Sequence, residues 1–314
     1  MTQSRGERDH VSASEFEALL SAVSTWGRWG ENDQRGALNE LTPERVAAAV
    51  RLVRDGVSVS LSLPLNTRFA ADNPEPALHR MALPETPDGG TGSLQVFKDF
   101  VGSDYHNDGH SHIDAFCHVA YEGSFYNGTP AETLTAKGAT ADSIRVLEDG
   151  LVGRGVLLDI PRLQGVPWLE PGEHVLREDL EASEREQDVT VGAGDILLVR
   201  TGLVRRLADL GAWETATAKP GLHPRAMPLL AERGVAALGC DGNSDTAPST
   251  TEGVAFPIHV LALNAMGVHL FDYLNLEDLA AACERAERWE FLFVAAPLRI
   301  TGGTGSPVNP IAVF

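Results

Sequence analysis

Cysteine and long apolar runs are scarce in this sequence. The 314 residues include three cysteines, Cys117, Cys240 and Cys283, and their number and spacing fit neither a disulfide framework nor a zinc knuckle. No apolar stretch approaches the roughly 18 residues of a membrane-spanning helix. The opening stretch "MTQSRGERDHVSASEFEALL" lacks the basic and apolar regions of a signal peptide. These absences predict a cytoplasmic protein with no membrane partner.

Basic residues are also few. Lys and Arg total 25 against 44 Asp and Glu, which gives a formal net charge of −19 and a pI near 4.8. Nucleic acids and anionic membranes require a basic patch, so the charge argues against both as partners. The hydrophobic share of 43% is ordinary for a globular protein with a substantial core. We therefore expect a protein that binds a small molecule.

Helix and strand signals are mixed along the chain. Apolar periodicity predicts a helix at 11–24, and Thr42 and Pro43 begin a second helix that Gly56 ends. Strands are predicted within the following ranges: 57–65, 153–163, 191–203, 223–244 (after a helix) and 289–300. Because the order lacks a strict strand–helix rhythm, we expect one α/β domain over 1–314, with a mixed sheet or partial barrel.

Three parts of this domain have a distinct character. Residues 1–56 form an N-terminal helical segment. Residues 66–94 are rich in Pro and Gly, and so long a loop is typical of a lid or of a disordered segment. Residues 301–314 contain "GGTGSPVNP", which lacks the lysine and the following helix of a phosphate-binding loop. We expect a rigid C-terminal tail at a subunit contact.

The segment "YHNDGHSHIDAFCH", residues 105–118, concentrates ligand-type side chains at even positions. They are His106, Asp108, His110, His112, Asp114 and His118. In an extended chain, residues two apart point to the same side, and imidazoles with carboxylates suit zinc or manganese. Gly109 is a turn signal that can restrict the alignment to residues from His110 onward. The alternative is a polar loop whose histidines lie at the surface.

The same segment resembles the signature of the bacterial cyclase family, which includes kynurenine formamidase and isatin hydrolase. The family motif is H-x-G-T-H-x-D-x-P-x-H. Its second His corresponds to His112, its Asp to Asp114 and its last His to His118, whereas its first His corresponds to Asp108. The motif's Gly, Thr and Pro are replaced as well, so the chain looks like a variant branch with a histidine-rich H-x-H-x-D pattern.

The resemblance extends over most of the chain. It continues in "WGENDQRGALNELTPERV", "GDILLVRTG", "PGLHPRAMPLLAERGVAALGCD", "FPIHVLALNAMGVHLFDYLNLEDLA" and "APLRITGGTGSPVNPIAVF". It implies the family's α/β fold of the swivelling β/β/α type, with a mixed sheet and a small barrel-like core flanked by helices. It also implies homodimers or homotetramers with the active site near a subunit interface.

The resemblance further assigns roles to individual residues. It makes His112 and Asp114 metal ligands, and His106 or His110 could replace the missing first ligand. Asp272 falls one residue after the family's usual ligand Glu, and its shorter carboxylate could bind the metal or instead orient a histidine. His118 becomes the general base, and His259 becomes a second active-site histidine.

A divalent ion, zinc or manganese, lowers the pKa of bound water toward roughly 7 and polarises a carbonyl. An imidazole can then shuttle the proton. These parts predict hydrolysis of an amide, cyclic amide or lactone in a small aromatic substrate. Two alternatives stay open: a cyclase, dehydratase or isomerase that uses the same histidines with or without metal, and a silent ligand-binding homologue.

Aromatic residues near the predicted site are candidates for the substrate pocket. They are Trp26, Trp29, Phe125 and Tyr126. Cys117 lies between Phe116 and His118, and at period two it points away from the histidines, so we do not expect it to be a nucleophile. No serine-hydrolase elbow G-x-S-x-G is present.

Overall fold

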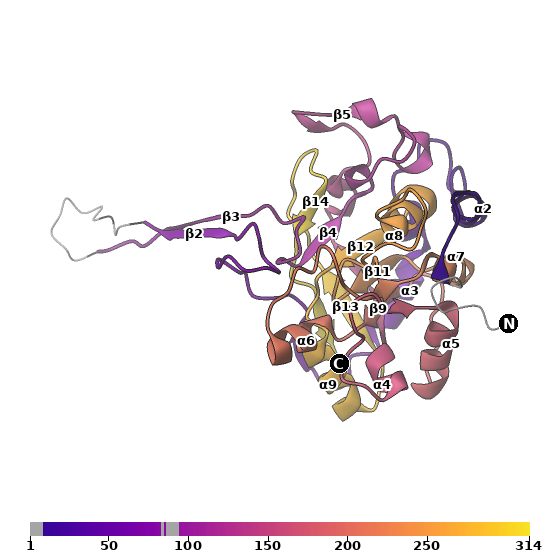
Figure 1. Ribbon diagram of the computed structural model, residues 1–314. Coiled ribbons are helices and arrows are strands. Elements are labelled where there is room, and N and C mark those ends of the chain that lie inside the picture. Colours follow the sequence, from indigo (N-terminus) through magenta and orange to yellow (C-terminus); the bar gives the residue numbers. More distant parts are fainter. Residues whose placement is uncertain (1–8, 83–84, 86–93) are drawn as a thin grey trace.

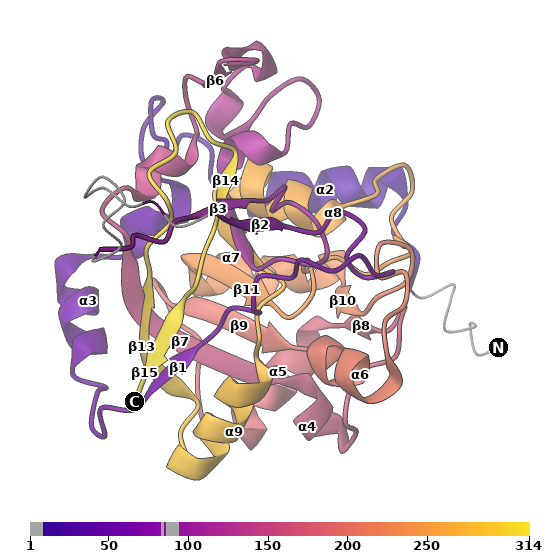
Figure 2. The same cartoon turned by 90° about the vertical axis from the view of Figure 1, so that its left-hand side faces the viewer.

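A computed structural model of the chain describes residues 9–82, 85 and 94–314. Its centre is a mixed sheet that curls into half of a barrel, with helices packed around it (Figures 1 and 2). This confirms the predicted fold class, an α/β domain with a mixed sheet and a barrel-like core flanked by helices. None of the helices in the described residues is long and apolar enough to cross a membrane.

The sheet has nine strands, and its middle is parallel. In spatial order they are β1 (Ser58–Ser60), β15 (Ile311–Val313), β13 (Glu290–Ala295), β7 (Leu151–Asp159), β9 (Ile196–Arg200), β11 (Ala237–Cys240), β12 (His269–Asp272), β4 (His112–Asp114) and β14 (Gly305–Pro307). Strands β7, β9, β11 and β12 pair in parallel, and the strands on either side of them pair antiparallel.

The parallel strands are apolar on both faces because both faces are covered. In β9, Leu197 belongs to a core shared with helices on one side of the sheet, and Ile196 and Leu198 belong to a second core on the other side. The predicted strands at 153–163, 191–203, 223–244 and 289–300 correspond to β7, β9, β11 and β13.

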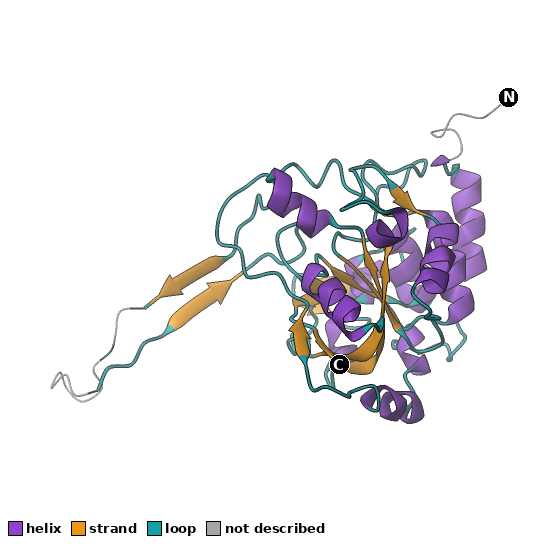
Figure 3. Cartoon of the chain, turned by 90° about the horizontal axis from the view of Figure 1, so that it is seen from below, coloured by secondary structure: helices purple, strands orange, loops and turns teal. Residues whose placement is uncertain are grey.

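The helices pack around this sheet (Figure 3). They are α2 (Ala13–Val23), α3 (Pro43–Val50), α4 (Ile160–Gln164), α5 (Arg177–Glu186), α6 (Leu203–Leu210), α7 (Met227–Arg233), α8 (Pro257–His259), which continues as a π-helix (Val260–Met266), and α9 (Glu277–Ala286). The predicted start at Thr42 and Pro43 is confirmed, because the Thr42 hydroxyl accepts from the Arg45 N–H at 3.4 Å. The helix predicted at 11–24 begins at Ala13, and the Ser12 hydroxyl before it accepts from the Glu15 N–H at 3.2 Å.

Two predicted boundaries are wrong. Helix α3 ends at Val50, well before Gly56. The N–H of the next residue, Arg51, donates to the carbonyl oxygens of Ala48 and Ala49. The strand predicted over 57–65 shortens to β1. The predicted tail over 301–314 is part of the sheet, because β15 fills the gap between β1 and β13, and β14 pairs with β4.

A hairpin projects from the body of the molecule (Figures 1 and 3). It pairs β2 (Leu78–Met81) with β3 (Asp99–Gly102) in antiparallel register. The loop predicted over 66–94 therefore contains a strand. Its residues 83–84 and 86–93 lie outside the described residues, and its role as a lid stays a prediction.

Candidate functional site

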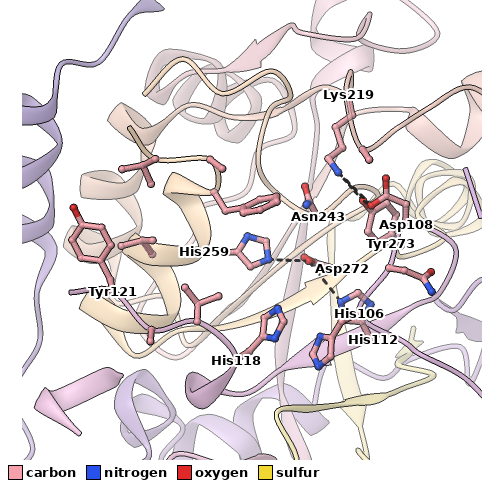
Figure 4. Close-up of a pocket in the computed structure, with 18 of the residues that line it drawn as sticks. His106, Asp108, His112, His118, Tyr121, Lys219, Asn243, His259, Asp272 and Tyr273 are labelled. Atoms are coloured by element: carbon pink, nitrogen blue, oxygen red, sulfur yellow. Dashed lines mark hydrogen bonds and ion pairs between the residues drawn. The ribbon is translucent and has the colours of Figure 1, made fainter. Parts of the chain in front are cut away.

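Two neighbouring strands bring three ligand-type side chains together. In β4, His112 and Asp114 are two residues apart and share one face. β12 runs antiparallel to β4 in a register that sets Asp272 directly opposite His112. Cross-strand neighbours lie on the same face, so the carboxylate of Asp272 points toward the imidazole of His112 (Figure 4).

The backbone holds the ring of His112. Its Nδ1 lies 2.8 Å from the carbonyl oxygen of His110, to which it donates. Its Nε2 then faces Asp114 Oδ1 at 3.6 Å and Asp272 Oδ2 at 3.9 Å. A ring nitrogen held in this way leaves the second nitrogen free to act as a ligand.

The ring of His259 is held in the same way, but its partner is a carboxylate and not a backbone carbonyl. Its Nδ1 bonds Asp245 Oδ2 at 2.6 Å, and its Nε2 faces Asp272 Oδ2 at 3.3 Å and Asp114 Oδ2 at 3.5 Å. Burial lowers the pKa of His259, but its hydrogen bonds to the three carboxylates outweigh burial and raise that pKa well above its ordinary value. The residue ends α8, directly before a π-helix, an element that is frequent at functional sites.

His106 and His118 complete the cluster as a stacked pair. Their ring centroids are 4.0 Å apart and their planes differ by 5°. His106 Nδ1 lies 2.9 Å from Asp114 Oδ1, and its Nε2 lies 3.0 Å from the hydroxyl of Thr304. Burial lowers the pKa of His118 to about 4, although Asp114 opposes the shift. The His118 ring is therefore neutral at pH 7.

The donor set suits a divalent metal ion. Asp114 is 0% exposed, and within the described residues neither of its carboxylate oxygens accepts a hydrogen bond from a backbone N–H or a hydroxyl. Histidine nitrogens surround it instead: the potential ligand atoms of His106, His112 and Asp114 lie within 4.8 Å of one another, and so do those of Asp114, His118 and His259. Nitrogen and carboxylate oxygen are the ligands that zinc and manganese accept.

The cluster opens into a cavity of about 490 Å³. The cavity is lined by the cluster residues His106, His112, His118, His259 and Asp272, by the polar residues Asn107, Asp108, Lys219 and Asn243, by the aromatic residues Tyr121, Phe256 and Tyr273, and by small or aliphatic side chains that include Val119, Val254 and Val260. A concave site with a few polar groups on an apolar lining is typical of small-molecule binding.

Six predicted site residues come together here: His106, His112, Asp114, His118, His259 and Asp272. The structure does not bring His110 to the cluster. The chain turns at Asp108 and Gly109, so the extended alternation begins only after His110, which is buried outside the cavity lining. Of the two residues predicted to replace the first ligand, His106 is the one beside Asp114.

The four predicted substrate-pocket aromatics lie elsewhere and require correction. Phe125 and Tyr126 are buried in the two cores, and Trp29 packs against one of them. The indole N–H of Trp26 donates to the carbonyl oxygen of Asn264 at 2.6 Å. The aromatic residues that line the cavity are Tyr121, Phe256 and Tyr273.

Several residues in or beside the cavity could not be predicted from the sequence. Lys219 and Asn243 lie in loops without a recognisable pattern, and Asp245 gains its role through contact with His259. Asp108 stands out in the sequence as the residue at the family's first histidine position. Burial raises the pKa of Cys117 to about 12, and its side chain lies outside the cavity lining, as expected for a non-nucleophile.

Comparison with known proteins shows the family. A family model described as "Putative cyclase" matches residues 59–245, more than half of the chain. A crystal structure titled "a novel cyclase" is 33% identical, with a TM-score of 0.84 over 93% of this chain and 99% of the other. The chain belongs to the cyclase family. The variant branch with an H-x-H-x-D pattern stays a prediction.

Isatin hydrolases are also similar to this chain. The isatin hydrolase of Roseibium aggregatum is 29% identical over 147 residues, which are 45% of this chain and 53% of that protein. The match therefore spans about half the length of this curated relative. The structure of isatin hydrolase A from Ralstonia solanacearum covers 87% of this chain and 98% of its own, at 22% identity and a TM-score of 0.58, which shows the shared fold.

Proposed function

We propose that this protein is a metal-dependent hydrolase that cleaves an amide, cyclic amide or lactone bond in a small aromatic molecule. The observation that carries the proposal is the fully buried carboxylate of Asp114 beside four imidazoles that line a cavity of small-molecule size. The similarity to isatin hydrolase supports hydrolysis as the reaction.

The residues that would hold the ion are His106, His112, Asp114, His259 and Asp272, and zinc or manganese fits their nitrogen and oxygen atoms. A divalent ion bound there would supply Lewis acidity and an acidified water molecule. The two carboxylates Asp114 and Asp272 both face the Nε2 of His259, so the site concentrates negative charge where a cation would be most strongly attracted.

In this proposal His118 moves the proton. It lines the cavity, and its low pKa keeps it neutral at pH 7. A neutral imidazole can accept a proton from water at the cluster and return it to the leaving nitrogen or oxygen. The stacked ring of His106 holds the plane of His118 in place.

The rest of the cavity orients the substrate. Val119, Val254 and Phe256 form an apolar surface beside the cluster. Such a surface packs against an aromatic ring and keeps bulk water from the reacting bond.

Metal analysis and chelation test the proposal. We expect protein purified without added metal to contain stoichiometric zinc or manganese, and chelation to abolish turnover of a panel of formyl-anilides, imides and lactones. Asp114→Ala should lose the metal, whereas the control His79→Ala, on the projecting hairpin, should keep it. Turnover that persists in metal-free protein would exclude the metal-dependent hydrolase. Ligand binding without any turnover would favour a silent homologue.

A further inference from the structure

A polar cluster on the cavity wall has no part in the chemistry proposed above. It consists of Asp108, Lys219, Asn243 and Tyr273, which line the cavity across from His118 (Figure 4). The side chain of Lys219 is only 2% exposed, and lysine is almost never so deeply buried unless it is paired. An isolated buried ion pair adds little stability, so the cluster calls for a role in the cavity.

The donors of Lys219 are fully used. An ammonium group has three N–H donors and no acceptor. Its Nζ lies 2.9 Å from the Tyr273 hydroxyl and 3.4 Å from Asp108 Oδ1, and with the amide oxygen of Asn243 turned toward it, 3.2 Å from that oxygen. The same amide orientation lets the Asn243 NH₂ donate to a backbone carbonyl at 3.2 Å. The buried cation therefore has no donor left for a ligand.

The acceptors of the cluster are not fully used. Asp108 Oδ1 accepts from both Tyr273 and Lys219, but within the described residues Oδ2 accepts only from the Thr215 hydroxyl, at 2.6 Å. A carboxylate offers about four acceptor positions over its two oxygens, so one position on Oδ2 remains. The side chain of Asp108 is 15% exposed and lines the cavity. Although the cluster contains a lysine, the group that it offers to a ligand in the cavity is a hydrogen-bond acceptor, the carboxylate of Asp108.

We propose that Asp108 determines substrate specificity by accepting a hydrogen bond from an N–H or O–H group on the part of the substrate remote from the scissile carbonyl. Lys219 neutralises the charge of Asp108 and, with Tyr273 and Thr215, fixes its orientation. A carboxylate group of the substrate at this position would meet Asp108 with no donor between them, and the cavity rejects it. The inference rests on the proposed hydrolase function and deepens it by naming the substrate's second recognition group.

A matched set of substrates tests this inference on the unaltered protein. The set consists of formanilides that carry a hydroxyl, a methoxy or a carboxylate group at the same ring position, in meta and para series. Because a site built to accept a hydrogen bond discriminates strongly against analogues that lack the donor, kcat/KM in the better series should be at least about tenfold higher for the hydroxyl than for the methoxy compound, mainly through KM. The carboxylate should be the poorest substrate. Equal rates, or a preference for the carboxylate, would overturn the inference.

The variant Asp108→Asn separates recognition from a structural role. An Asn amide can direct its NH₂ into the cavity, so the hydroxyl-to-methoxy ratio should fall to near one and the carboxylate should improve in relative terms. An equal loss for all three compounds would mark Asp108 as purely structural and contradict the inference. If the variant does not fold, the order of kcat/KM among the three compounds on the unaltered protein still tests the inference.

The inference can be tested even if the proposed reaction fails. If none of the formanilides is hydrolysed, the three corresponding anilines are titrated into the protein by calorimetry. Tightest binding of the hydroxyaniline supports the role of Asp108 independently of hydrolysis. Equal binding, preference for the carboxylate or no binding of any of the three overturns it.

Discussion

Asp245 lies behind the cavity wall and holds the ring of His259 through its Nδ1 at 2.6 Å. It also accepts the backbone N–H of Ile258 at 2.7 Å, at the start of α8. The carboxylate thus fixes both the helix that carries the imidazole and the rotation of the imidazole itself. Outer groups of this kind orient a ligand and raise its basicity.

We predict that Asp245→Asn weakens the site without unfolding it. The amide oxygen can still accept from Ile258, but the amide cannot stabilise the His259 ring as a carboxylate does. Metal affinity or kcat/KM should fall by roughly 10–100-fold. Competitive metal titration and steady-state kinetics measure the two effects, and the thermal midpoint serves as the control for folding. Unchanged affinity and rate would show that His259 needs no such support.

Asp142 is a second residue whose charge matters, in this case for stability. It is fully buried, and burial raises its pKa to about 6, against about 3.9 in an unfolded chain. Between these values the folded protein binds more protons than the unfolded one, so this group's contribution to stability falls as the pH rises from about 4 to 6.

We therefore predict that Asp142→Asn stabilises the protein at pH 7.5 by about 3 kcal/mol and has little effect at pH 4, where both side chains are neutral in the folded protein. Its positive φ of 55° favours Asn as a replacement. Urea unfolding of both proteins at the two pH values measures the difference. A constant difference across this range would show that the ionisation of Asp142 does not affect folding.

Strand β14 illustrates how an element remote in sequence shapes the site. It follows the Gly-rich turn at 302–303 and pairs with β4, so that Gly305 lies opposite Asp114 and Thr304 reaches His106. A Cβ on Gly305 would approach the carbonyl oxygen of Ile113 to 2.4 Å and the ring of His106 to 2.7 Å. Only glycine allows the strand and the imidazole to come this close.

Gly305→Ala should accordingly separate β14 from β4. We expect a loss of about 1–3 kcal/mol in the free energy of unfolding together with weaker metal binding. The matched control is Gly192→Ala, where the nearest atom to an added Cβ is 3.8 Å away. Chemical denaturation and metal titration compare the two variants. Equal behaviour of both would contradict the close approach of β14.

Sequence patterns predicted elements best where the cause is local. Ser12 and Thr42 cap helices through side-chain bonds to nearby N–H groups, and the buried parallel strands are continuous apolar runs. The residues of the candidate site were predicted only where the chain resembles the family's motifs, in the segment 105–118 and at His259 and Asp272. The prediction that His110 is a ligand was wrong because a turn breaks the alternation before it. Lys219 and Asp245 could not be predicted, because only tertiary packing brings Lys219 to the cavity and Asp245 to His259.

At the scale of the molecule, the projecting hairpin is the most unusual feature. Large apolar side chains on it and on its base are more than half exposed: Phe69, Leu78, Met81, Phe97, Phe100 and Val101. An isolated two-stranded hairpin is marginally stable in water, and exposed apolar patches often mark interaction sites. The hairpin is therefore the surface on which we place the contact of the predicted homodimer or homotetramer.

We predict that the protein sediments as a homo-oligomer and that replacing Phe97 and Phe100 together by Asp shifts it toward the monomer. The control variant Leu210→Asp alters an exposed apolar residue on α6 and should leave the assembly unchanged. Sedimentation velocity over a range of concentrations measures the masses. A monomeric unaltered protein, or an oligomer indifferent to both Phe replacements, would contradict the prediction.

The central claim is that the imidazoles and carboxylates around Asp114 hold one divalent cation. Anomalous diffraction from crystals of the purified protein, collected on either side of the zinc and manganese absorption edges, tests it most directly. The account predicts a single strong anomalous peak within bonding distance of Asp114 and of histidines beside it. The absence of a peak there in metal-supplemented crystals, or a peak bound only by residues outside the cavity, would contradict it.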